Sequence, residues 1–211
     1  MSEETIVHLL RHGEVDNPHR VLYGRLPGFH LSASGRVMAA AAADYFAERP
    51  VVALFSSPLE RAVETAAPVA ERLGLPIVID ERLTEASNHF EGLTFGVGDG
   101  VLRRPAHWPY LLNPFRPSWG EPYGDVVTRM LAVMEVAREA AEGAEAVCVS
   151  HQLPIWATRR MADGRRLWHN PAARQCALGS VTSFTYSGRR LAGVSYTVPA
   201  RRQVPQGDAA Q

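Results

Sequence analysis

The sequence predicts an α/β fold, a three-layer sandwich with a mostly parallel central sheet and helices on both faces. Two observations predict it. Short apolar runs without polar alternation recur along the chain, and such runs suit parallel strands that are buried on both faces. Stretches with helix start and stop signals separate these runs, and strands that alternate with helices favour a parallel sheet.

The apolar runs mark the expected strands. Four buried strands are expected at residues 6–10, 52–55, 77–79 and 146–149. Near the end of the chain, residues 180–186 and 190–198 flank Ser187-Gly188, which indicates a hairpin or a tight return. These two segments suit the last strands of the same fold.

Helix signals lie between the strands. The first helix is expected to start at Ser32 or Ser34 and to run to about Arg49, because a proline follows. The second is expected to begin at Ser57-Pro58-Leu59-Glu60, where serine as N-cap, proline at the first helical position and the glutamate form a capping box. Further helices are expected at about residues 125–142 and from near residue 154.

Composition narrows the class of protein. The 211 residues are 46% hydrophobic and 21% charged, which indicates a packed globular core. The 22 basic and 22 acidic side chains balance, so no basic excess points to nucleic acid. No run approaches the roughly 20 apolar residues that span a bilayer. We therefore expect neither a nucleic-acid nor a membrane partner, and the composition carries no signal for an oligomeric state.

The ends of the chain and its cysteines suggest where the protein resides. The apolar run at residues 6–10 is too short for the core of a signal peptide. Two cysteines, Cys148 and Cys176, form no disulfide framework in a chain of this length, and both suit reduced thiols. The cytoplasm is therefore the expected location.

We expect one domain over residues 1–198, with an irregular insertion at about 96–122 and a loose C-terminal tail at 199–211. The insertion holds five prolines together with Trp108 and Trp119. Loops of this length in compact domains are usually functional or disordered, and the two tryptophans favour a packed lid.

Three charged clusters follow expected strands. Arg11-His12-Gly13 ends the first strand, Arg61 lies in the first turn of the helix after the second, and His151 follows the strand at 146–149. Each alone would commonly be a surface or capping residue. In an open α/β sheet, however, ligands bind at the carboxyl ends of the strands, and parallel strands would bring these side chains to one edge. The sequence therefore predicts an anion site there, because guanidinium groups bind anions well.

These motifs resemble those of the histidine phosphatase superfamily, also called the phosphoglycerate mutase-like family. Its hallmark Arg-His-Gly is Arg11-His12-Gly13 here, and its Ser-x-x-x-Arg-x-x-x-Thr runs from Ser57 through Arg61 to Thr65. Its late histidine is His151, and its acidic residue after a leucine is Glu85, followed by Glu91-Gly92. The resemblance spans residues 5 to about 162.

The resemblance implies a phosphomonoester hydrolase that acts through a phosphohistidine intermediate on a small phosphorylated metabolite. His12 would be the nucleophile and Glu85 the proton donor to the leaving group. Arg11, Arg61 and His151 would form the phosphate pocket, so that His151 is both a catalytic and a phosphate-binding residue. No step of this chemistry needs a metal or a cofactor.

Three more residues are candidates for substrate binding. Asn17 stands one place earlier than the asparagine that many family members carry. Arg103 and Arg104 lie in the insertion, where they would add contacts to an anionic substrate, with His107 nearby.

Two other functions remain open. A phosphoglycerate mutase-type phosphotransferase ranks second, because the chain lacks the Glu-Arg-x-Tyr-Gly segment and the greater length of the mutases. The other alternative is a non-catalytic member that binds a phosphorylated ligand, and the presence of all four pocket residues argues against it.

Overall fold

The structure, a computed structural model, describes residues 4–94 and 120–202. Its strands are β1 (Glu4–Arg11), β2 (Val51–Ser56), β3 (Ile77–Ile79), β4 (Glu145–Ser150), β5 (Val181–Ser187) and β6 (Arg190–Thr197). Its α-helices are α1 (Ala33–Phe46), α2 (Glu60–Leu73), α4 (Tyr123–Ala140), α5 (Gln152–Ala162) and α6 (Pro199–Arg202). Two 3₁₀ turns complete it, η1 (Glu81–Leu83) and η4 (Pro171–Ala173).

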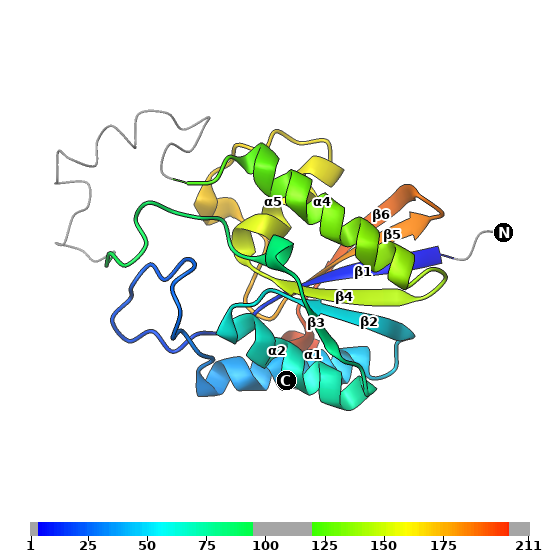
Figure 1. Cartoon of the computed structure of the whole chain (residues 1–211), viewed down its shortest axis with the longest axis horizontal. Helices are drawn as coiled ribbons and strands as arrows, with labels where there is room; N and C mark the ends of the chain where they lie inside the picture. Colours follow the sequence, from blue (N-terminus) through cyan, green and yellow to red (C-terminus); the bar gives the residue numbers. More distant parts are fainter. Residues whose placement is uncertain (1–3, 95–119, 203–211) are drawn as a thin grey trace, which may run out of the picture.

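The strands form one sheet in the order β3-β2-β4-β1-β5-β6. β1 to β4 run parallel to one another, while β5 is antiparallel to β1 and forms a hairpin with β6. Helices α1 and α2 cover one face of the sheet, and α4 and α5 cover the other (Figure 1). The predicted three-layer α/β sandwich with a mostly parallel sheet is confirmed.

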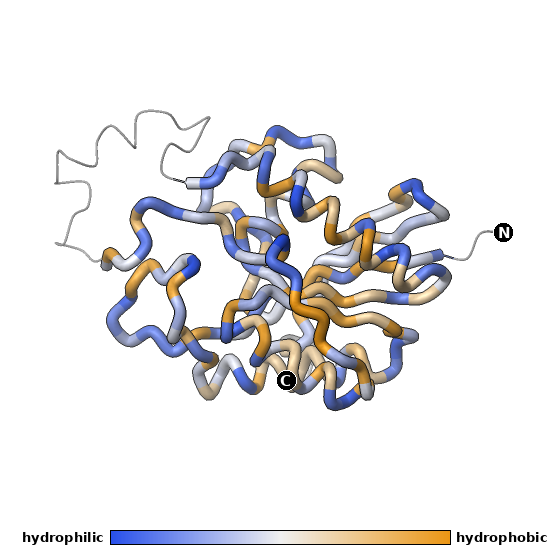
Figure 2. Tube along the Cα trace, viewed as in Figure 1, coloured by the Kyte–Doolittle hydropathy of each residue, from blue (hydrophilic) through white to orange (hydrophobic). Residues whose placement is uncertain are grey.

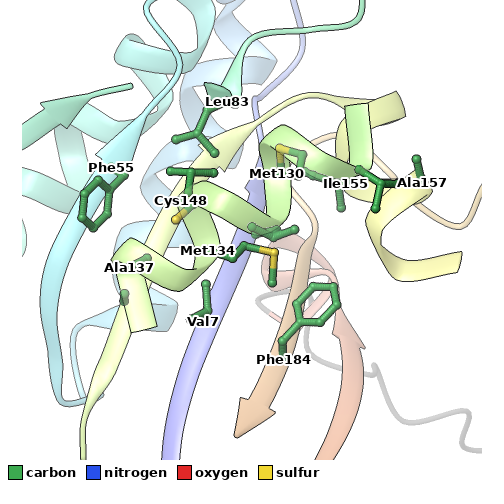
Figure 3. Close-up of a cluster of buried hydrophobic side chains, with 14 of the residues drawn as sticks. Val7, Phe55, Leu83, Met130, Met134, Ala137, Cys148, Ile155, Ala157 and Phe184 are labelled. Atoms are coloured by element: carbon green, nitrogen blue, oxygen red, sulfur yellow. The ribbon is translucent and has the colours of Figure 1, made fainter. Parts of the chain in front are cut away.

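Two apolar clusters fill the space between the layers. Leu9 packs in the cluster under α4 and α5, whereas its neighbour Leu10 packs in the cluster against α1 and α2. Figure 3 shows the first cluster, in which Met130 and Met134 of α4 lie against the sheet. Successive side chains of a strand point to opposite faces. A strand that is buried on both faces is therefore mostly apolar, and hydrophobic residues gather along the central strands (Figure 2).

The strand expected at residues 77–79 is present but is not buried. β3 pairs only with β2, at the edge of the sheet, and Val78 and Ile79 are 47% and 50% exposed. A short apolar run has the same sequence appearance in a central strand and in an edge strand, because burial depends on which neighbours the strand acquires.

The helix boundaries differ from the expected ones in two informative places. Ser32 is the N-cap of α1, as expected, and its hydroxyl accepts a hydrogen bond from the Gly35 N–H, but the helix ends at Phe46. The capping box proposed at Ser57 is wrong. α2 begins only at Glu60, and its N-cap is Leu59, whose side chain makes no capping bond. The Ser57 hydroxyl instead contacts His151, which follows β4.

The domain boundaries need one correction. The tail expected to be loose from residue 199 begins with the short helix α6, which lies against α1. Most of the insertion expected at 96–122 falls outside the described residues. No helix in the described ranges combines the length and the apolar composition that crossing a membrane requires.

A buried ionic group ties the first strand to its neighbours. The His8 imidazole lies 2.9 Å from Glu145 and 2.8 Å from the Ser183 hydroxyl, and Arg49 donates to both Glu145 oxygens at 2.7 and 2.8 Å. Burial lowers the pKa of His8, so its imidazole is neutral in the folded protein.

We expect the free energy of unfolding to fall as the pH drops below about 6.5. Below that pH the unfolded chain protonates His8, while the folded chain holds it neutral. Burial shifts the pKa of His12, His151 and His169 downward in the same way. Two groups oppose them, because burial raises the pKa of Glu85 and the hydrogen bond to Glu64 raises that of His30. Each histidine with a lowered pKa costs about 1.4 kcal/mol per pH unit.

Urea unfolding between about pH 5 and pH 7.5 measures this dependence. In a His8→Gln variant the slope should be smaller by about 1.4 kcal/mol per pH unit, because one group with a shifted pKa is gone. Equal slopes for the two proteins would contradict the assignment of His8.

Candidate active site

The site lies where β1, β2 and β4 end. These strands are parallel neighbours, so the residues that follow them meet at one edge of the sheet. His12 follows β1, Arg61 lies in the first turn of α2 after β2, and His151 follows β4 directly. All three are almost completely buried, and the rings of His12 and His151 lie 5.1 Å apart between centroids. The predicted gathering of these side chains at one edge is present.

A cavity of about 280 Å³ opens at this edge. Arg11, His12, Tyr23, Glu85, Gln152 and Arg174 are among the residues that line it. Arg61 lies directly behind the wall, because its guanidinium carbon is 4.7 Å from the centre of the Tyr23 ring. The candidate nucleophile His12 and the candidate acid Glu85 therefore line the same cavity. Arg11 lies in its wall, and Arg61 lies behind it.

The backbone sets the tautomer of His12. Its Nδ1 lies 2.7 Å from the carbonyl oxygen of Gly13, which can only accept a hydrogen bond, so Nδ1 carries the proton and Nε2 is bare. Burial lowers the pKa of His12 well below its usual value, and the charges of Arg11 and Arg61 lower it further. A neutral imidazole with a bare nitrogen can act as a nucleophile.

Each of the two arginines, Arg11 and Arg61, donates one hydrogen bond to a backbone carbonyl. Arg11 donates from Nη1 to the Cys176 carbonyl at 2.5 Å, and Arg61 donates from Nη2 to the Gly24 carbonyl at 2.6 Å. Their buried Nε atoms, and Nη1 of Arg61, have no hydrogen-bond partner among the described residues. Leaving buried charged donors without acceptors is costly. Three cationic N–H groups thus point to an anion as the ligand.

His151 is positioned by Ser57. The Nε2 atom of His151 lies 2.8 Å from the Ser57 hydroxyl, and its Nδ1 has no partner among the described residues. Burial lowers the pKa of His151 well below its usual value, and His12, Arg61 and Arg11 lower it further. A lowered pKa favours the neutral form of this imidazole.

Glu85 lines the same cavity and has an elevated pKa. Burial raises the pKa of its carboxyl group, and this outweighs the hydrogen bond from the Ala86 N–H and the charges of Arg11 and Arg61. A carboxyl group with a raised pKa keeps its proton to a higher pH and can donate it to a leaving group.

Thr65 connects the second motif to the first. Its hydroxyl accepts a hydrogen bond from the Gly13 N–H at 3.0 Å and donates to the Arg61 carbonyl at 2.6 Å. The three residues of this motif therefore have three different contacts. Ser57 orients His151, and Thr65 holds the turn after His12. Arg61 lies between them with buried guanidinium nitrogens that have no partner among the described residues.

We expect Gly13→Ala to destabilise the protein by about 1–3 kcal/mol. A Cβ at Gly13 would lie 2.5 Å from the Gly35 carbonyl oxygen, so the backbone next to His12 must shift. Urea unfolding measures the loss. Gly124→Ala, where the added Cβ meets no atom within 4 Å, is the matched control and should not destabilise. Wild-type stability of Gly13→Ala would contradict this reading of the turn.

Of the three substrate-binding candidates, only Asn17 lies within the described residues. Asn17 does not line the cavity, because its side chain donates to the Val21 carbonyl at 2.8 Å and accepts from the Val21 N–H at 3.0 Å. These two bonds hold the turn at residues 17–21, and residues 21–24 line the cavity. Arg103 and Arg104, as well as His107, lie outside the described residues.

Sequence reasoning missed several residues of the site. Ser57 and Thr65 were in the matched motif, and for Thr65 the four-residue spacing from Arg61 along one side of α2 was a usable signal. Tyr23, Gln152 and Arg174 line the cavity from segments with no motif, so the sequence held no comparable signal for them.

Fold and site together define an α/β protein in which two arginines and two histidines gather at the carboxyl edge of the sheet. The chain belongs to the histidine phosphatase superfamily (branch 1), whose family model matches residues 7–198. The expected family is confirmed.

Known proteins resemble the chain in sequence and in structure. It is 56% identical over 200 residues to Uncharacterized protein Rv0525 of Mycobacterium tuberculosis. The matched region covers 95% of this chain and 99% of that protein. The structure of Bacillus stearothermophilus YhfR has a TM-score of 0.76 at 26% identity and covers 89% of this chain and 94% of its own. The native structure of mycobacterial glucosyl-3-phosphoglycerate phosphatase Rv2419c has a TM-score of 0.70 at 28% identity. The match covers 86% of this chain and 90% of that chain.

Proposed function

We propose that the protein is a metal-independent phosphomonoester hydrolase that acts on a small phosphorylated metabolite through a phosphohistidine at His12. The observation that carries this is the bare Nε2 of a neutral, buried His12 beside three buried guanidinium nitrogens without partners among the described residues. The membership of the chain in the histidine phosphatase superfamily supports the same reaction, as does its likeness to a glucosyl-3-phosphoglycerate phosphatase.

In the first step the Nε2 lone pair of His12 attacks phosphorus, the N–P bond forms, and the bond from phosphorus to the ester oxygen breaks. Glu85 gives its proton to that oxygen, which leaves as an alcohol. Arg11 and Arg61 bind the three peripheral oxygens, which stay negative through the transition state. The guanidinium groups supply the positive charge from the protein itself.

In the second step water attacks the phosphohistidine. Glu85, now a carboxylate, takes one proton from the water, the N–P bond breaks, and His12 returns to its neutral form. The sum of the two steps is hydrolysis of a phosphomonoester to an alcohol and inorganic phosphate. Splitting one difficult displacement into two easier ones is the advantage of the covalent route.

Phosphate release from p-nitrophenyl phosphate and from a panel of phosphorylated metabolites, each with and without EDTA, tests the proposal. We expect release that EDTA does not suppress. Loss of activity with EDTA and its return with added metal would refute metal independence. Isomerisation of 3-phosphoglycerate without net phosphate release would favour the mutase alternative and overturn the hydrolase.

A further inference from the structure

Arg174 lies on the cavity wall outside the motifs that define the family. It follows η4 in the connection to β5, is half-buried, and lines the cavity together with Arg11 and Glu85. It forms no ion pair with any residue of the described ranges. The phosphate pocket already has two arginines, so a third one on the wall is in excess of what a single phosphoryl group requires.

Two neighbours hold Arg174 in place. Its Nε donates to Nε2 of His169 at 2.9 Å, and its Nη1 donates to Oε1 of Gln152 at 3.2 Å. His169 can accept this bond because its Nδ1 donates to the Leu167 carbonyl at 2.6 Å, which leaves Nε2 bare. A guanidinium has five N–H donors, so about three of them remain for a ligand.

The histidine that supports Arg174 is itself closely packed. His169 is only 7% exposed, and its ring lies 5.5 Å from that of Tyr123 and 6.1 Å from that of Trp156, measured between centroids. Burial lowers the pKa of His169, which keeps it neutral and able to accept. A cation oriented in this way before the ligand arrives loses little conformational freedom on binding.

Two acidic residues of the described ranges line the cavity, Glu85 and Glu121, and neither forms an ion pair with Arg174. Glu85 is the acidic side chain whose charge acts on it most strongly. In the proposed mechanism, however, Glu85 carries its proton when substrate binds, and a neutral carboxyl group balances no charge. Arg174 is then available to an anionic group of the substrate.

We propose that Arg174 binds a second anionic group of the substrate, so that the preferred substrates are small phosphomonoesters that also carry a carboxylate or another phosphate. This proposal rests on the phosphomonoesterase activity proposed above. Arg174 is thus a specificity-determining residue, and His169 is a positioning residue that acts through it.

Matched pairs of compounds test the proposal, with p-nitrophenyl phosphate as the reporter substrate. Glycerol 3-phosphate and 3-phosphoglycerate differ in that a hydroxymethyl group replaces the carboxylate, while fructose 6-phosphate and fructose 1,6-bisphosphate differ by one phosphate. Each compound is measured as a competitive inhibitor, which requires no turnover of it. The two pairs separate a carboxylate from a phosphate as the second anion.

In the wild type we expect the more anionic member of at least one pair to bind about 10- to 100-fold more tightly. Arg174→Met should remove most of that preference, and Arg174→Lys, which keeps the charge but loses the planar fork, should remove part of it. Arg165→Met removes the same charge from an exposed position that does not line the cavity and should leave the preference intact.

The outcomes separate this proposal from the one on which it rests. Hydrolysis of the reporter with no preference in either pair, or an Arg174→Met variant that weakens both members of a pair equally, would overturn the role of Arg174 and leave the hydrolase in place. Failure of the wild type to hydrolyse any phosphomonoester would overturn both. His169→Phe should raise the inhibition constant of the more anionic compound only, since a merely structural role would affect both compounds.

Discussion

Replacing His12 by alanine is expected to lower the turnover of p-nitrophenyl phosphate by about 10⁴- to 10⁶-fold, because removing a nucleophile eliminates the covalent route. Within the described residues His12 is the cavity-lining side chain whose bare nitrogen is fixed by a backbone hydrogen bond. Initial rates of the two proteins at saturating substrate measure the loss. His19→Ala, at an exposed position that does not line the cavity, is the matched control and should retain full turnover.

Two further measurements separate chemistry from folding. His12 is buried, so the thermal unfolding of His12→Ala must be compared with that of the wild type. Labelled phosphate from substrate should be trapped on the wild type, in an acid-labile and alkali-stable linkage, and not on the variant. Label on His12→Ala, or turnover within about tenfold of wild type, would mean that another group is the nucleophile.

Replacing Glu85 by glutamine is expected to slow hydrolysis of alkyl phosphates by about 10²- to 10⁴-fold, the usual contribution of a general acid. The same change should affect p-nitrophenyl phosphate far less, since p-nitrophenolate leaves without needing a proton. Parallel assays on glycerol 3-phosphate and p-nitrophenyl phosphate measure the difference. Glu71→Gln, on the exposed face of α2, should leave both rates unchanged.

The pH profile provides an independent check on Glu85. Burial raises its pKa, so the acid form persists above the pH at which an ordinary carboxyl group ionises, and activity on alkyl phosphates should fall as the pH rises through this raised value. The pKa of His12 is shifted far down, so the nucleophile stays neutral on the acid side. Activity should therefore be highest at mildly acidic pH, and the alkaline decline should disappear in Glu85→Gln. Equal losses on both substrates, or an unchanged profile, would assign the proton to another group.

The sequence alone indicated most of the fold and the centre of the site, because both depend on local patterns. Apolar runs predict strands buried on both faces, and the charged residues directly after them are carried to the carboxyl edge by any parallel sheet. Arg11, His12, Arg61 and His151 could therefore be placed together without coordinates. The position of Glu85 on the cavity wall agrees with its expected role.

Contacts between segments far apart in the chain were decided only by the tertiary structure. Ser57 has the local appearance of an N-cap, yet the pairing of β2 with β4 brings its hydroxyl to His151 instead. Arg174 has no local signal at all, because its place depends on how His169 and Gln152 pack around it. Strand and helix formation depend on nearest neighbours along the chain, whereas hydrogen bonds that orient a site depend on sheet register and helix packing, which the chain acquires only when it is folded.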